Sequence, residues 1–347
     1  MAKHCMQPLV GLTVAVVMSF FAGAVRASEL RLMTFNIKGD AATLFDIGNR
    51  EKSWKFFDLS DPFNPIEGPH RRDRAISVIR QFGPDILGVQ ELKNNQRNDL
   101  SDAFPEFGFY GQGREGGNSG DRNGIYYRTS RFDLIDQGDF WLSETPTVPG
   151  TTFQGFGGDL GNPRMATWVK LFDQQTDKTY FVLNTHWSLD SLARRQSAAL
   201  IQEMLPGLAG NLPILLLGDL NATRHRSEYA TLRGLDDPGD VPLDDSFVDG
   251  GGVDGRSFHN FNGGVSGSRI DHILHTSQDF EGLDASIVRT TFDNGLFPSD
   301  HYPVTVTLLV VPEPSARRMA EVLIGLLGLA RLCEVAVHAA RGAKPAV

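Results

Sequence analysis

The stretch Ile214-Leu215-Leu216-Leu217-Gly218-Asp219-Leu220-Asn221 is the most informative part of this 347-residue chain. Its apolar run predicts a buried strand, which ends in a glycine followed by an acid and an amide. Since side chains alternate along a strand, we expect Asp219 and Asn221 on one face at its polar end. Two oxygen-bearing groups in one place suit a hard metal ion or a phosphoester, although Gly, Asp and Asn would also suit a tight turn.

The two ends of the chain differ from its middle. Lys3 and His4 precede an apolar stretch that closes with Val25-Arg26-Ala27, which is the pattern of a secretory signal over residues 1–27. A membrane anchor is the weaker alternative because the uncharged run is short. We therefore expect export to the periplasm, the cell surface or the medium, a main domain at 28–310 and a separate tail at 311–347.

The tail begins with Val311-Pro312-Glu313-Pro314-Ser315 and continues with basic residues and an apolar stretch at 322–332. It resembles a PEP-CTERM sorting tail, although it runs on further past its arginines than such tails do. Because Glu321 and Arg331 leave the apolar stretch short for a membrane span, an amphipathic terminal helix is an equal alternative.

Charge and cysteine content exclude some function classes. The chain has 33 Lys and Arg against 42 Asp and Glu, a formal net charge of −9. It therefore lacks the general basic surface of a tight nucleic-acid binder, although a bound metal or a local basic cleft can offset this. Its two cysteines, Cys5 and Cys333, lie outside 28–310, which excludes a disulfide framework and a thiol nucleophile in the main domain.

Strands outnumber helices in the predicted secondary structure. Apolar stripes that end at Gly83-Pro84 and Pro206-Gly207 predict two helices, at 71–82 and 190–205. Nine strands are predicted, at 30–36, 85–92, 124–128, 132–140, 166–172, 180–186, 213–220, 269–275 and 304–311. Many strands with few helices between them predict two packed sheets flanked by helices rather than a doubly wound parallel sheet.

Polar residues recur where the predicted strands end. In chain order the motifs are Thr34-Phe35-Asn36, Gln90-Glu91, Asn184-Thr185-His186, Gly218-Asp219-Leu220-Asn221, Arg269-Ile270-Asp271-His272-Ile273 and Ser299-Asp300-His301-Tyr302-Pro303. This ordered set resembles the endonuclease/exonuclease/phosphatase superfamily, which includes pancreatic-type deoxyribonucleases, over about residues 30–309. The nearest likeness is to a bacterial branch, through the loop at 111–114 and the strand at 140–143.

The resemblance implies a four-layer, deoxyribonuclease-like α/β sandwich with two mixed, largely antiparallel sheets, and a metal-dependent phosphoric ester hydrolase. Glu91 would be the principal ligand of Mg²⁺ or Mn²⁺, because hard cations prefer carboxylate oxygens. Asn36 would orient Glu91 or a metal-bound water, and Asp300 would be a further ligand. Taken alone, Asn36 would be a turn residue at the end of a strand.

The resemblance also implies catalytic roles. Asp219 and Asn221 would position the attacking water and bind phosphoryl oxygens or a second metal. His301 would contact the phosphate or the water, with Asp271 accepting its other ring N–H. His186 would donate to a phosphoryl oxygen or to the leaving group. From the residues alone, Asp271 and His301 could be unrelated polar residues, and His186 could be structural.

Three residues are candidate substrate contacts, namely Arg114, Arg164 and Asn184. Many relatives carry an aspartate where this chain has Ser188, and a glutamate is common where it has Asp121. The loop at 40–69 also looks longer than usual. We expect Ser188 and Asp121 to line the substrate cleft, so the substrate of a relative does not transfer directly.

The expected function is that of an exported phosphoesterase that hydrolyses a phosphodiester, in nucleic acid or a lipid head group, by in-line attack of water. A phosphomonoesterase acting on a small phosphorylated metabolite is the main alternative, and a non-catalytic binding relative is a weaker one. No obligate protein partner is expected. His272 and His259 are expected to have no catalytic role.

Overall fold

The computed structural model describes residues 28–40, 52–55, 57–58, 61–65, 70–153, 161–292 and 295–311. Ser28–Val310 form one compact unit. The predicted leader at 1–27, nearly all of the predicted tail and much of the loop at 40–69 lie outside the described residues. Within the described ranges, no helix is long and apolar enough to cross a membrane.

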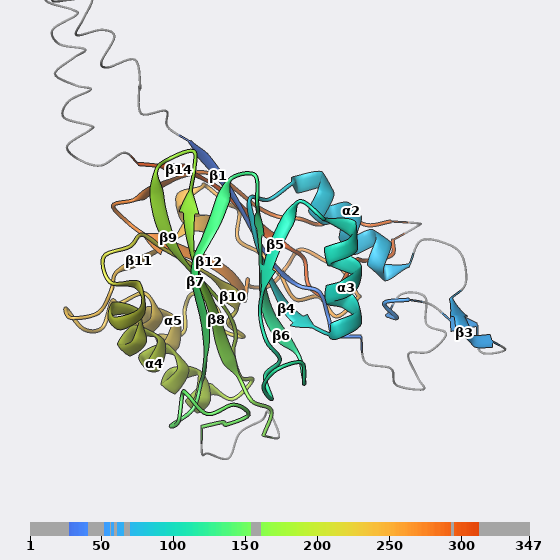
Figure 1. Cartoon of the computed structure of the whole chain (residues 1–347), viewed down its shortest axis with the longest axis horizontal. Coiled ribbons are helices and arrows are strands. Elements are labelled where there is room, and N and C mark those ends of the chain that lie inside the picture. The colour runs from blue at the N-terminus through green and yellow to red at the C-terminus, as the bar shows by residue number, and fades with distance from the viewer. Residues whose placement is uncertain are drawn as a thin grey trace, which may run out of the picture. The chain divides into compact units, whose positions relative to one another are not determined.

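Two six-stranded sheets form the centre of the unit (Figure 1). The first sheet has the order β13 (Phe280–Ile287), β14 (Val304–Val310), β1 (Glu29–Asn36), β4 (Ile86–Leu92), β6 (Arg122–Arg128) and β5 (Phe107–Tyr110). The second has the order β11 (Leu243–Asp245), β12 (Asp271–Thr276), β10 (Ile214–Asp219), β9 (Lys178–His186), β8 (Met165–Asp173) and β7 (Phe132–Trp141). Each sheet has one parallel pair, β1 with β4 and β9 with β10, and its other pairs are antiparallel. A separate pair joins β2 (Phe57–Asp58) to β3 (Asp61–Pro65).

Helices cover the outer faces of both sheets, as Figure 1 shows. Helices α2 (Arg71–Phe82) and α3 (Asn94–Ala103) pack on the first sheet, with Ile79 and Leu100 buried against Phe35. Helices α4 (Ser191–Ala209) and α5 (Ser227–Leu232) pack on the second, with Ile201 buried against Leu216. A short helix, α6 (Ser246–Asp249), follows β11. The predicted sandwich of two mixed sheets flanked by helices is confirmed.

Strand alternation determines where the site forms. Leu30 and Leu32 of β1 belong to the core between the sheets, as do Leu215 and Leu217 of β10. Each such side chain stabilises the fold by about 1.5–3 kcal/mol when fully buried. Every second residue of a strand lies on the same face. On β1 the series that begins with Leu30 and Leu32 ends at Asn36, and on β10 the series of Leu215 and Leu217 ends at Asp219. The layer between the sheets therefore becomes polar at the end where these strands stop.

The helices and strands predicted from the sequence mostly coincide with elements of the structure. The helix predicted at 71–82 is α2, but the one predicted at 190–205 continues through Pro206 to Ala209. Pro206 removes only one N–H near the helix end, and its carbonyl still accepts from the Gly210 N–H. Eight elements were missed, namely β2, β3, α3, β5, α5, β11, α6 and β13. Helix α3 has no apolar stripe, since only Gln96 and Leu100 are buried along it.

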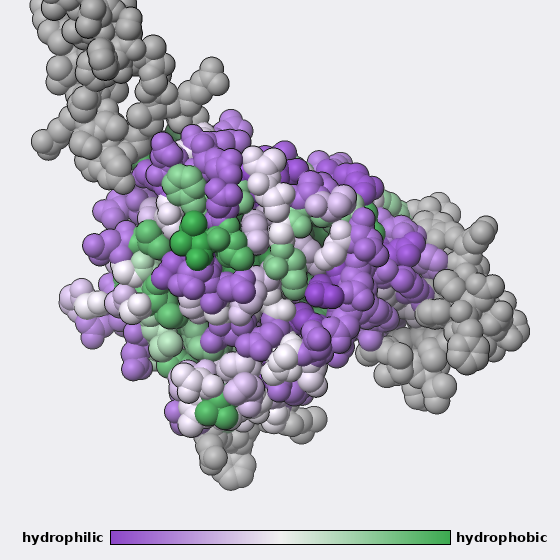
Figure 2. Space-filling model, in the orientation of Figure 1, coloured by the Kyte–Doolittle hydropathy of each residue, from purple (hydrophilic) through white to green (hydrophobic). Residues whose placement is uncertain are grey.

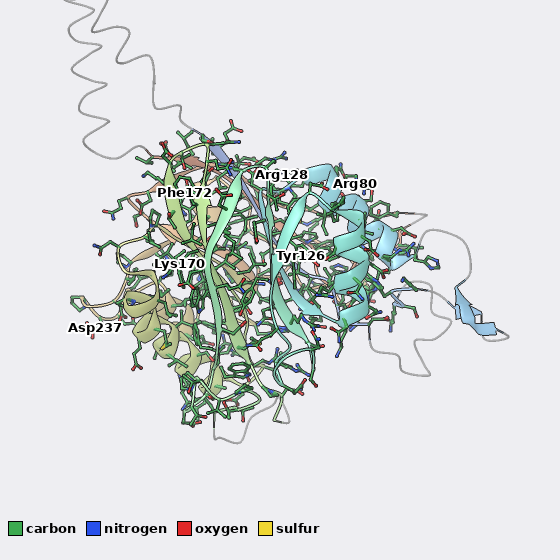
Figure 3. All side chains as sticks on the ribbon, in the orientation of Figure 1. Arg80, Tyr126, Arg128, Lys170, Phe172 and Asp237 are labelled. Carbon is green, nitrogen blue, oxygen red and sulfur yellow. The ribbon has the colours of Figure 1, made fainter. Side chains whose placement is uncertain are left out.

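The outer surface is largely hydrophilic on the face drawn in Figure 2, with smaller apolar areas between charged side chains. Figure 3 labels two arginines near the first sheet, Arg80 and Arg128. The Arg80 guanidinium lies 5.4 Å from the centre of the Phe104 ring, and that of Arg128 lies 4.8 Å from the Phe107 ring. These aromatic rings are thus partly covered by long cationic side chains.

Candidate active site

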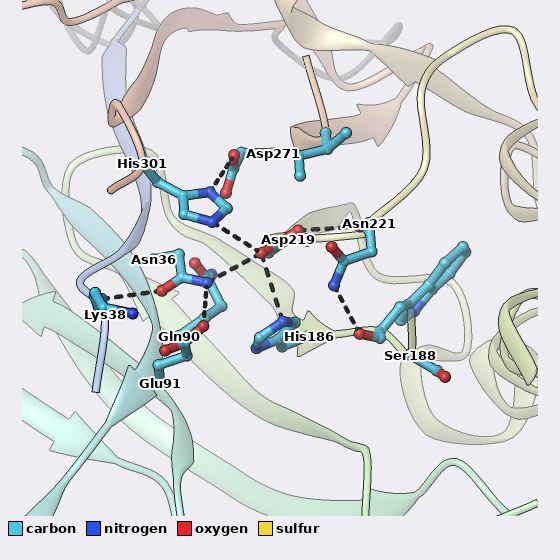
Figure 4. A network of polar contacts seen from close by, with 12 residues as sticks. Asn36, Lys38, Gln90, Glu91, His186, Ser188, Asp219, Asn221, Asp271 and His301 are labelled. Carbon is cyan, nitrogen blue, oxygen red and sulfur yellow. Dashed lines mark hydrogen bonds and ion pairs between the residues drawn. The ribbon is translucent and has the colours of Figure 1, made fainter. Parts of the chain in front are cut away.

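The polar end of the layer between the sheets forms a connected network, drawn in Figure 4. The Asn36 amide, from the end of β1, donates to Glu91 Oε1 at 3.0 Å and to Asp219 Oδ2 at 3.0 Å. Its oxygen accepts from the Lys38 N–H at 3.0 Å. Because Glu91 belongs to the first sheet and Asp219 to the second, one amide fixes two carboxylates from different sheets. Asn36 thus contacts Glu91 directly, and the role that the resemblance implied for it, orienting Glu91 or a metal-bound water, stays a prediction.

Glu91 reaches this network through a break in strand alternation. Val89 faces the helices, so regular alternation would also turn Glu91 toward them. Instead Glu91 has φ 57°, and the pairing of β4 with β6 shifts register between Val89 and Leu92. Bulges of this kind redirect a side chain and occur often beside active sites. The strained φ therefore marks a position at which the direction of the carboxylate matters.

Hydrogen bonds keep the Glu91 carboxylate charged. Burial alone would raise its pKa, but the Gly39 N–H at 3.0 Å and the Asn36 amide hold the pKa below its ordinary value. Arg71, the first residue of α2, fixes the segment that carries Gly39 by donating to the carbonyls of Ile37 and Lys38. The site thus presents an ionised carboxylate held from two sides.

Asp219 lies at the centre of the network. His186 Nε2 is 3.5 Å and His301 Nε2 is 3.7 Å from its Oδ2 atom. Its Oδ1 atom accepts from the backbone N–H of Asn221, which has φ 47°. Burial and the Asp271 charge raise the pKa of Asp219, against the opposite effects of the two histidines and Asn36. A carboxylate with a raised pKa is suited to accepting a proton near neutral pH.

Asp271 and His301 form a close pair. His301 Nδ1 lies 2.9 Å from Asp271 Oδ2, so the structure brings together two residues that are thirty positions apart. Burial alone would lower the pKa of His301, but Asp271 and Asp219 raise it to about 10. Asp271 Oδ1 is buried and has no hydrogen-bond partner among the described residues. The pair therefore holds a protonated imidazole in a fixed orientation, with one acceptor to spare.

The donor set of the site fits a divalent cation. The carboxylates of Glu91, Asp219, Asp271 and Asp300 outnumber the nearby cations Lys38, Arg71 and His301. Asp300 Oδ2 already faces a cation, since Lys38 Nζ lies 3.2 Å away. Such an acid excess and its oxygen donors suit Mg²⁺ or Mn²⁺.

Two sets of residues could be considered as metal ligands. The predicted set is Asn36, Glu91 and Asp300. The closest acid and imidazole cluster at the site is instead Asp219, Asp271 and His301, whose ligand atoms lie within 4.8 Å of one another. His301 Nδ1 lies against Asp271 and its Nε2 faces Asp219, so the contacts within this second set suit it to handling protons. The predicted metal ligands stay a prediction.

Two of the three predicted substrate residues lie together. Arg114, Arg164 and His186 line one small pocket, with Asp121 in its wall. Arg114 Nη1 pairs with Asp121 Oδ2 at 3.1 Å. Arg164 also lines a neighbouring cavity of about 80 Å³. The other walls of that cavity are mixed, with polar Thr152, Asn162, Ser188, Asp190, Gln196 and Ser197 beside apolar Leu142, Phe153, Leu192 and Ala193. The departures at Asp121 and Ser188 therefore lie in these two pockets.

Asn184 is placed differently from the expectation. It is fully buried, and its amide donates to the carbonyls of Val89 at 3.1 Å and Gly124 at 2.8 Å. Its oxygen accepts from the Gln90 amide at 2.7 Å. With these atoms used to join the two sheets, Asn184 positions the strands instead of contacting substrate. Strand alternation correctly predicts that Asn184 faces the other sheet. It does not predict whether the side chain is buried between the sheets or reaches the substrate cleft.

Three residues at the site were missed from the sequence. Lys38 has φ 54° and pairs with Asp300, and Arg71 fixes the loop beside it. Phe258 is half-exposed, and its ring centre lies 4.9 Å from that of His301. Nothing in the local pattern distinguishes Lys38 from a surface lysine or Arg71 from a helix-start residue. The bridge that pairs Phe258 with His301 joins segments far apart in the chain.

A model of the Endonuclease/Exonuclease/phosphatase family matches residues 33–301. The chain belongs to this family. Like its relatives it is a phosphoric ester hydrolase, and members of the family generally depend on a divalent metal. The match includes every predicted site residue, from Asn36 to His301.

Solved structures of family members share the fold. A family protein from Bacteroides thetaiotaomicron is 27% identical, with a TM-score of 0.68, over 82% of this chain and 99% of that one. A mannosyl-6-phosphatase from the same organism is 28% identical, with a TM-score of 0.66, over 80% and 99%. The uncharacterized protein L388 of Acanthamoeba polyphaga mimivirus is 25% identical over 158 residues, 44% of this chain. The match spans 58% of that curated relative.

Proposed function

We propose that this family member is an exported, divalent-metal-dependent phosphoesterase that acts by direct in-line attack of water on phosphorus. The observation that carries the proposal is the Asn36 amide, which holds Glu91 and Asp219 together from opposite sheets beside His301. Export rests on the leader pattern at 1–27. No cysteine lies within 28–310, and phosphoryl transfer needs positioning and charge neutralisation more than a covalent nucleophile.

Each residue of the site has a proposed role that depends on its charge. Glu91 and Asp300 would hold the metal with Asn36, and the metal would neutralise charge on the phosphoryl group and its leaving oxygen. Asp219, with its raised pKa, orients the water and accepts its proton, while the Asn221 backbone N–H donates to its Oδ1 atom and holds the carboxylate in place. His301, held by Asp271, donates to the phosphoryl oxygens as their charge develops. His186 and Arg164 face the phosphate from the small pocket.

The pockets favour a small phosphomonoester over the diester that the sequence first suggested. The cavity beyond Arg164 has room for a compact group, and the hydroxyl and amide side chains in its mixed lining suit a hydroxylated one. The chain is acidic overall, which disfavours a long polyanion. One of the solved relatives is a mannosyl-6-phosphatase. A sugar or polyol phosphate is therefore the first substrate to test.

A substrate panel tests this proposal. The purified protein would be assayed with Mg²⁺ or Mn²⁺ on hexose phosphates, a synthetic diester, plasmid DNA, RNA and sphingomyelin, with EDTA and the Asp219→Asn variant as controls. We expect EDTA-sensitive phosphate release from monoesters, at rates well above those on diesters. Faster cleavage of a diester would overturn the substrate class, and turnover that is insensitive to EDTA would overturn the metal dependence.

A further inference from the structure

We propose a second divalent-cation site, formed by Asp244, Asp249 and His275 at the edge of the second sheet. The ligand atoms of these three residues lie within 4.8 Å of one another. Asp244 of β11 and His275 of β12 are direct partners in the antiparallel register. Directly opposed side chains lie on one face of a sheet, about 5 Å apart at Cβ. Asp249 ends α6, the helix that directly follows β11.

The His275 ring is the observation that points to a ligand. Only 1% of this residue is exposed, and its Nδ1 lies 2.8 Å from Ser246 Oγ. Its Nε2 points toward Asp249 Oδ2 at 3.5 Å, which is longer than a hydrogen bond. A buried imidazole with one nitrogen anchored and the other aimed at carboxylates is how proteins hold histidine ligands.

The charges around the cluster leave room for a cation. The His275 ring is buried, and burial favours the neutral imidazole that a metal ligand must be. Arg233 Nη2 pairs with Asp244 Oδ1 at 3.1 Å and neutralises part of the cluster. Within the described ranges Asp249 pairs with His275 and has no ion pair with a lysine or an arginine, and a metal ion would supply the missing positive charge.

The donor set indicates which ion would bind. One imidazole and two carboxylates favour Zn²⁺ or Mn²⁺ over Mg²⁺ and Ca²⁺, which prefer oxygen ligands alone. The site is separate from the active site, because His275 lies four residues beyond Asp271 on β12, a distance of about 13 Å. Bound there, the ion would join α6 to β11 and β12, so its role would be to stabilise this edge.

Metal titration of the full chain tests the site. Zn²⁺ and Mn²⁺ binding would be measured by calorimetry, and the melting temperature by thermal unfolding, for the wild type, Asp249→Asn and Glu91→Ala. Asp284→Asn is the matched control, because it removes an exposed acid on neighbouring β13. Glu91→Ala separates this site from the proposed active-site metal, so the two proposals can fail independently.

We expect Zn²⁺ to raise the melting temperature of the wild type, Asp284→Asn and Glu91→Ala by several degrees. Asp249→Asn should lose this response and bind Zn²⁺ about 100-fold more weakly, since even partners outside the ligand shell contribute about 10–100-fold. Unchanged Zn²⁺ binding and thermal response in Asp249→Asn would overturn the site. Loss of all measurable binding in Glu91→Ala, with Asp249 intact, would also overturn it.

Discussion

Two buried polar clusters lie at opposite ends of β1, and they are built differently. At its start, Arg131 donates to Asp173 at 3.0 and 2.9 Å, to Asp85 at 3.0 Å and to the Glu29 carbonyl at 2.7 Å. At its end, Asn36 joins the active-site network, in which Asp271 Oδ1 has no hydrogen-bond partner within the described ranges. The first cluster is saturated with hydrogen bonds, and the second has acceptors left over.

Backbone geometry shows the same difference. Lys38, Glu91 and Asn221 all have positive φ at the site, whereas neither Arg131 nor Asp173 does. Strain and unpaired polar groups cost stability, and they persist where function requires them. From this comparison we expect the Arg131 cluster to stabilise the fold and the residues around Asn36 to carry out the reaction. Substitutions at the two ends should have opposite consequences.

The largest effect is expected from Asp219→Asn at the active-site end. Losing the group that accepts the proton from water should lower kcat by about 10²–10⁴-fold. The free energy of unfolding should stay the same or rise, because the change removes repulsion between Asp219 and Asp271. Assays of phosphate release and urea unfolding would measure both quantities. A variant that is active but unstable would contradict the assignment.

Arg131→Met at the other end should do the reverse. Removing one partner of a buried ion pair leaves Asp173 uncompensated, and should cost about 3–5 kcal/mol in the free energy of unfolding. The kcat of the folded fraction should not change. Arg128→Met is the control, since Arg128 also faces Asp85 but is more exposed, and it should cost less than about 1 kcal/mol. An equal loss of unfolding free energy in Arg131→Met and Arg128→Met would contradict the stabilising role proposed for the Arg131 cluster.

A third test separates the two faces of β12. His272 follows Asp271 but faces the helices, where its ring packs 4.6 Å from that of Tyr229. Burial and Arg269 lower the pKa of His272 to about 3, so the folded protein resists protonating a ring that the unfolded chain protonates near pH 6.5. Stability should therefore fall as the pH drops from about 6.5 toward 3, by up to about 1.4 kcal/mol per pH unit for this group.

His272→Gln should flatten this dependence of stability on pH, measured by urea unfolding between pH 4 and 8. The variant should keep the kcat of the wild type, because His272 faces away from the site. A pH dependence as steep as that of the wild type would show that other groups cause the loss. Since side chains alternate along a strand, the neighbours Asp271 and His272 lie on opposite faces of β12.

The smallest effect is expected at the substrate pocket. Arg164→Lys keeps the charge but loses the planar, two-pronged donor, and should raise KM by about tenfold with little change in kcat. Arg195→Lys, at an exposed position on α4, is the control and should leave both constants unchanged. A fall in kcat without a change in KM would place Arg164 in the chemical step instead.

Much of this site could be predicted because the apolar residues of several strands are followed by polar residues where the strand ends. Alternation from Leu215 and Leu217 leads to Asp219, and the same logic places Asn36 and Asp271 between the sheets. Glu91 could be named only through the family resemblance, since its direction depends on a positive φ and a register shift. The full burial of Asn184 and the approach of Phe258 to His301 depend on how distant segments pack. Helix α3 was missed because it has few buried residues.

The central claim is that His301 and Asp271 act as one unit beside Asp219, and a double-mutant cycle tests it most directly. The kcat/KM of His301→Gln, Asp271→Asn and the double variant would be measured on the best monoester with saturating Mg²⁺. Because groups that act together are not additive, each single variant should lose about 10²–10⁴-fold and the double variant should be little worse than His301→Gln. If the two losses multiply independently, the pair does not work as a unit and the account is wrong.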